Sequence, residues 1–118
     1  MRELDFDDVL ATARAEIDRL PADASALDLV FFAACEEVAR RVVLRYQFTT
    51  GPRLLEALEF PERCPADYPQ ALAWKTGVAT LHAIASAIAA RHGDELAAEV
   101  CRDPISRIAR IYRDGLTR

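Results

Sequence analysis

Residues 76–90 read TGVATLHAIASAIAA, the longest stretch of the chain without Asp, Glu, Lys or Arg. At helical spacing the large apolar side chains of this stretch share one face: Leu81, Ile84 and Ile88. A second face consists of alanines: Ala79, Ala83, Ala87 and Ala90. Such a helix is typical of the centre of a bundle, and the stretch falls short of the ~20 residues that a membrane span needs. We therefore expect a central, buried helix over about 70–91, with both faces covered and with His82 hydrogen-bonded in the core.

The chain before this stretch predicts a first helix over about 5–20. Its apolar residues recur at steps of four and three: Phe6, Leu10, Ala13, Ile17 and Leu20. Asp5, Asp7 and Asp8 place negative charge at the positive end of the helix dipole, and Pro21 is expected to end the helix.

A second helix is predicted from Ser25, which resembles a capping residue, towards Phe48. Residues 29–35 are apolar on every side, so we expect this half to be the more deeply buried. In the other half, Glu36 precedes Arg40 by four residues and Glu37 precedes Arg41 by four, the favourable order for ion pairs along a helix.

The remaining segments predict short helices at about 52–60, 95–101 and 104–113, with a proline-rich connection at 61–69. No segment alternates between apolar and polar residues as a strand does. The fold class is therefore all-α, a compact bundle of five to six helices that forms a single domain over residues 1–118.

Composition restricts the function. The chain has 118 residues, 15 Lys+Arg and 19 Asp+Glu, which gives a net charge of −4 and no overall attraction to nucleic acids or anionic membranes. Three widely spaced cysteines specify no disulfide framework and no four-cysteine zinc site, which favours a reducing compartment. With no targeting signal visible and a bias towards Arg and Ala, we expect a cytoplasmic bacterial protein.

Candidate catalytic groups are few. Two histidines, His82 and His92, are ten residues apart on one helix and cannot share a metal ion. Glu56 and Glu59 lie on one face of the predicted short helix, so a metal-dependent hydrolase remains one alternative. Cys64 beside an arginine is a weaker candidate nucleophile, because no partner base is marked.

Charge is distributed unevenly along the chain. Residues 1–37 contain three Arg and ten acidic residues, net −7, whereas residues 38–118 contain twelve basic and nine acidic residues, net +3. Two acidic and three basic residues are our candidate partner-binding groups: Asp7, Asp8, Arg107, Arg110 and Arg113. Since the three arginines share one face of the last predicted helix, nucleic-acid binding there is a second alternative.

These observations favour a non-catalytic protein–protein interaction module, such as an adaptor, a regulatory subunit or an inhibitor of another bacterial protein. We expect no metal and no cofactor. Because six short helices leave apolar surface on residues 29–35 and on the alanine-rich helix, we also expect a homodimer.

Overall fold

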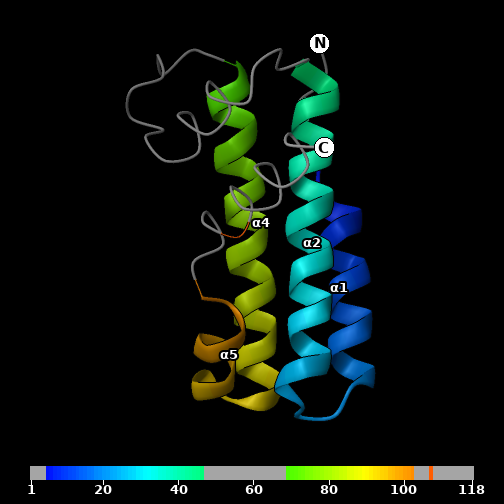
Figure 1. The fold of residues 1–118 in the computed structure, drawn as a ribbon, viewed down its shortest axis with the longest axis vertical. Helices are drawn as coiled ribbons and strands as arrows, with labels where there is room; N and C mark the ends of the chain where they lie inside the picture. The colour runs from blue at the N-terminus through cyan, green and yellow to red at the C-terminus, as the bar shows by residue number, and fades with distance from the viewer. Residues whose placement is uncertain (1–4, 47–68, 103–106, 108–118) are drawn as a thin grey trace.

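The computed structural model describes residues 5–46, 69–102 and 107, which contain four helices and no strand. The helices are α1 (Asp7–Arg19), α2 (Ala24–Tyr46), α4 (Pro69–His92) and α5 (Asp94–Val100). Helices α1, α2 and α4 lie side by side along the long axis, and α5 packs against the last turns of α4 (Figure 1). The predicted all-α class is confirmed. The helix expected at 52–60, the helix expected at 104–113 apart from residue 107, and residues 61–68 of the connection expected at 61–69 lie outside the described residues. Pro69, expected in that connection, is the first residue of α4.

Helix α1 lies within the predicted range of about 5–20 and is shorter by two residues at its start and one at its end. The amide N–H of Asp7 donates to Oδ1 of Asp5 (2.8 Å), and the acidic first turn complements the helix dipole. Pro21 disfavours helical geometry at the preceding Leu20, which is extended (φ −83°, ψ 148°), so the helix ends at Arg19. The apolar face of α1 packs Val9, Ala13 and Ile17 into the core, together with Phe6.

Helix α2 is capped by Asp23, and the prediction of Ser25 as its cap is wrong. Oδ1 of Asp23 accepts a hydrogen bond from the amide N–H of Ser25 (2.9 Å), and the carbonyl of Asp23 accepts one from the N–H of Leu27 (3.0 Å). Helical hydrogen bonding therefore starts at Asp23, which leaves Ser25 inside the first turn, where its own amide needs an acceptor.

Helix α4 contacts α1, α2 and α5, as α2 in turn contacts the three other described helices, and α4 is not the most buried helix among the described side chains. It contributes Leu81, Ile84 and Ile88 to the core, all fully buried. Helix α2 contributes more: Leu27, Phe31, Ala34, Cys35, Val38, Ala39 and Val42.

The outer face of α4 corrects two expectations. Ala79 and Ala90 are exposed, and Ala83 and Ala87 are only half-buried, so the second face is not covered as predicted. His82 is exposed and is not a core residue. The physical reason is that Ala, Ser and His on the outer side need no cover, and the three neighbouring helices enclose only part of the α4 circumference.

Gly77 allows α4 to approach α2 closely. A Cβ at this position would lie 2.5 Å from Cγ1 of Val38, well inside an ordinary carbon–carbon contact, and 3.7 Å from the ring of Phe6. The absence of a side chain at Gly77 therefore sets the spacing of the two longest helices.

Gly93 separates α4 from α5. Its backbone (φ 100°, ψ 155°) lies in a region that is essentially restricted to glycine, and it allows the chain to turn directly into α5. Asp94 is the first residue of α5 and makes no side-chain cap hydrogen bond, so it stabilises the first turn through its charge.

Candidate functional site

An apolar groove of about 540 Å³ runs between α1 and α2. Its middle is lined by aliphatic side chains from both helices: Val9, Ala13, Leu29, Val30, Ala33 and Ala34. Residues 8–16 of α1 line its length and rise about 12 Å, slightly more than two turns of a helix. The groove therefore has the length and the apolar lining to accommodate a short amphipathic helix.

Two large apolar side chains of α2 are exposed, Leu29 in the groove and Phe32 outside its lining. Leu29 is 69% exposed and Phe32 is 39% exposed, and they are the exposed large hydrophobic residues of the described chain. Residues 29–35 are apolar on every side and were expected in the more deeply buried half of the helix, but they are buried on one face only. Helices α1, α4 and α5 cover the face of α2 that carries Phe31, Ala34 and Cys35.

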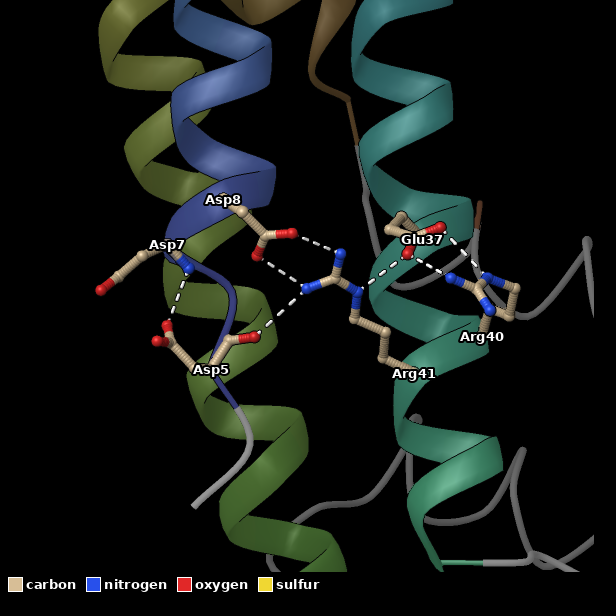
Figure 2. Close-up of polar contacts among 6 residues, drawn as sticks. All are labelled: Asp5, Asp7, Asp8, Glu37, Arg40 and Arg41. Carbon is tan, nitrogen blue, oxygen red and sulfur yellow. Dashed lines mark hydrogen bonds and ion pairs between the residues drawn. The ribbon is translucent and has the colours of Figure 1, made fainter. Parts of the chain in front are cut away.

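One end of the groove is closed by ion pairs around Arg41 (Figure 2). The guanidinium donates two hydrogen bonds to the carboxylate of Asp8, from Nη1 (2.7 Å) and Nη2 (2.6 Å), and Nε donates to Oε1 of Glu37 (2.8 Å). Nη1 also lies 3.3 Å from the carbonyl of Asp5, to which it donates. Glu37 accepts further hydrogen bonds from Arg40. This cluster links the start of α1 to the second half of α2.

The Arg41 cluster also fixes the protonation of its carboxylates. The hydrogen bonds from Arg41 lower the pKa of Asp8 to about 2, and those from Arg40 and Arg41 lower the pKa of Glu37. The pKa of Arg41 is raised by the hydrogen bonds it gives to Asp8 and Glu37. Both carboxylates are therefore charged at neutral pH, and neither is suited to general acid–base catalysis there.

The third carboxylate of the groove, Glu16, pairs with Arg19 on α1. With the pairs of Asp8 and Glu37, each acidic side chain that lines the groove has an arginine partner. The charged rim is therefore nearly neutral, although residues 1–37 as a whole are strongly acidic.

The predicted partner-binding residues lie in different places. Asp8 belongs to the Arg41 cluster, and Asp7 is exposed at the start of α1. Arg107 is bound within the chain: its Nη2 lies 2.7 Å from the carboxylate of Asp28 and donates to the carbonyl of Val100 (3.0 Å). Its guanidinium carbon is 5.7 Å from the ring centroid of Phe31. The structure does not bring Arg107 together with Asp7 or Asp8 in these interactions.

Four of the predicted residues lie outside the part of the chain that the structure describes: Glu56, Glu59, Arg110 and Arg113. Cys64 lies outside it as well. For these residues the metal, nucleic-acid and nucleophile hypotheses stay predictions.

The two described cysteines are poor nucleophiles. Burial raises the pKa of Cys35 to about 12 and the pKa of Cys101 to about 11, so both thiols are protonated at neutral pH. Within residues 5–46, 69–102 and 107, no group of three His, Cys, Asp or Glu residues is placed to hold a metal ion. In the same residues, no helix is long and apolar enough to cross a membrane.

A second hollow, of about 580 Å³, lies between α1 and α4. Its floor is formed by the small residues Ala83, Ser86 and Ala87, and Arg14 and Arg91 flank it. Arg91 is 3.3 Å from the backbone carbonyl of Asp18, to which it donates a hydrogen bond. This contact holds α4 against the end of α1.

The sequence predicted uncovered apolar surface on residues 29–35, but it did not indicate that Leu29 is the exposed residue in the groove or that Arg41 closes one end of it. The pairing of Glu37 with Arg41 is confirmed, whereas Arg40 pairs with Glu37 three residues earlier and not with Glu36 as predicted. No local signal indicated that Arg41 also binds Asp8, since these residues are 33 positions apart. No family model, curated protein or solved structure matches this chain.

Proposed function

We propose that this protein is a non-catalytic protein–protein interaction module whose α1–α2 groove binds an amphipathic helix. The observation that carries the proposal is the exposure of Leu29 beside a hollow lined by aliphatic side chains. Exposed apolar patches bordered by charged residues are common at protein-binding surfaces, because burying them against a partner removes apolar area from water.

The dimensions of the groove define the bound helix. About 12 Å of groove spans the side chains at positions i, i+4 and i+7 of a bound helix, since seven residues rise about 10.5 Å. The polar groups at the ends, including Asp8 and Glu16, are held by arginines of this chain and would fix the register of the helix rather than supply most of the affinity.

An interaction module also accounts for the chemistry of the described residues. The carboxylates of the Arg41 cluster stay charged at neutral pH, and the thiols of Cys35 and Cys101 stay protonated. We place the protein in a reducing compartment such as the bacterial cytoplasm, where unpaired cysteines persist. There it would act as an adaptor, a regulatory subunit or an inhibitor.

Site-specific photo-crosslinking tests this function. A photoreactive amino acid replaces Leu29 in the full chain, and a matched variant carries it at His82, which is exposed on α4 outside the groove. After irradiation in cells, protein adducts are expected at position 29 and not at position 82. Absence of adducts at position 29, or equal labelling at both positions, would contradict an interaction through the groove.

A further inference from the structure

The exposed side of α2 forms one continuous stripe beside the groove. Its members are exposed and follow the helical spacing of three and four: Ser25, Leu29, Phe32, Ala33, Glu36 and Arg40. A stripe with this spacing is the type of surface that packs against another helix, with large side chains fitting opposite small ones.

Acidic and basic residues are separated along α2, with the acidic residues before the arginines. Residues 20–39 contain four acidic residues and no Lys or Arg, whereas Arg40, Arg41 and Arg45 follow within the next six positions. At the start of the helix Asp23 is exposed, and near its other end Arg40 is exposed. Two such helices repel when they are parallel and attract when they are antiparallel.

An antiparallel register centred on Phe31 fits the charges and pairs the stripe residue Leu29 with Ala33, while the half-buried Val30 and Ala26 beside the stripe face Phe32 and Glu36. Residues of the two copies whose numbers add up to 62 then face each other, so Leu29 lies opposite Ala33 and Phe32 lies opposite Val30. Arg40 comes within one residue, about 1.5 Å of rise, of Asp23 on the other helix. Glu36 faces the uncharged Ala26, so no like charges are forced together.

We propose that the occupant of the groove is a second copy of this chain, which binds through α2 in antiparallel orientation and forms a symmetric dimer. The inference rests on the proposed function and names its partner. A two-fold dimer requires one patch that is complementary to itself, and this patch carries both the protruding Leu29 and the groove that receives it. The paired rim of Asp8, Glu16 and Glu37 keeps the repulsion between copies small in spite of the net charge of −4.

The first test is the mass of the full chain in solution, measured by sedimentation equilibrium from 1 to 100 μM. Wild type is expected to be dimeric in this range. Leu29→Glu should weaken the dimer about a hundredfold or more, since the change occurs twice in each dimer, and His82→Glu should leave it unchanged. A monomeric wild type, or a Leu29→Glu variant that stays dimeric with the wild-type dissociation constant, would overturn the inference.

A charge exchange tests the register. Arg40→Glu and Asp23→Arg should each weaken the homodimer about tenfold, because each places two like-charged pairs in the interface. An equimolar mixture of the two variants restores both opposite-charge pairs and should recover a wild-type-like dimer. Asp23→Arg also removes the cap of α2, but mixing cannot restore a cap, so recovery reports on the interface alone. A mixture that associates no better than the single variants would refute the antiparallel register.

The sedimentation and crosslinking results together distinguish failure of the homodimer proposal from failure of the proposed interaction function. A monomeric wild type whose Leu29 position crosslinks to a different protein retains the interaction function and refutes the second copy. A wild-type dimer with no adduct of any kind at position 29 would show that the groove is unused, which refutes both.

Discussion

Replacing Gly77 by Ala tests how closely α4 packs on α2. The new Cβ would lie 2.5 Å from Cγ1 of Val38, about 1 Å inside the ordinary carbon–carbon contact. Val38 is fully buried and β-branched, so it has essentially one side-chain conformation in a helix and cannot turn away. The ring of Phe6, 3.7 Å from the same point, limits movement on the other side. The clash can be relieved only by moving the helices apart.

Two opposing effects determine the size of the change. Ala is favoured over Gly within a helix by about 1 kcal/mol. Overpacking a closely packed core costs about 1–3 kcal/mol, and we expect the upper part of this range because Val38 and Phe6 are both almost fully buried. The net loss in free energy of unfolding is then about 1–2 kcal/mol, or roughly 4–8 °C in Tm.

Urea unfolding followed by circular dichroism measures this loss, and a double-mutant cycle assigns its cause. Val38→Ala alone leaves a cavity and should cost about 2 kcal/mol. In the double variant the methyl group introduced at position 77 occupies part of this cavity, so the two effects should fall short of additivity by about 1 kcal/mol or more. A Gly77→Ala variant with an unchanged or higher urea midpoint, or fully additive effects, would refute close packing at this point.

Three further predictions concern single groups. Asp8→Asn should lower the free energy of unfolding by less than about 1 kcal/mol at pH 6, because the ion pair of Asp8 with Arg41 is largely exposed. This difference from wild type should vanish as the pH falls from about 4, near the unfolded-state pKa of 3.8, through the native pKa of about 2. A difference in urea midpoint that is constant with pH would contradict the pairing. Gly93→Ala should cost about 1–3 kcal/mol in thermal unfolding through its backbone angle alone, since nothing lies within 4 Å of its Cβ position, and an unchanged Tm would count against this. Cys35, whose thiol pKa is about 12, should react with iodoacetamide at pH 8 only after unfolding in urea, as followed by peptide mass spectrometry; rapid labelling of the native protein would show that the thiol is accessible.

The end of α1 could be predicted because a single residue determines it: Pro21 disfavours helical geometry at Leu20, so the helix stops at Arg19. The start of α2 was predicted wrongly at Ser25, because Asp23 two residues earlier caps the helix. The apolar spacing of Leu81, Ile84 and Ile88 likewise identified the core face of α4 correctly. These signals depend on residues close together in the sequence, so they do not depend on how the helices are arranged in space.

The groove could not be predicted because it depends on how the helices are arranged. Residues 29–35 are apolar all round, and only the positions of α1, α4 and α5 decide that Phe31 is buried and Leu29 is exposed. The same applies to His82, which a uniformly apolar helix predicts to be buried but which lies on the uncovered side. The bond between Arg41 and Asp8 joins positions whose proximity no spacing rule encodes.

The Arg41 cluster closes the α1–α2 hairpin at the end opposite its loop. The loop at Leu20–Asp23 joins the two helices covalently, and Arg41 binds Asp8 and the carbonyl of Asp5 at the far end. A helix held at both ends has no free end from which to unwind, so the amide hydrogens of α1 should exchange with solvent together, in one opening event shared with α2. Arg41→Ala would free the first turn of α1, and its amides would then exchange ahead of the rest of the helix.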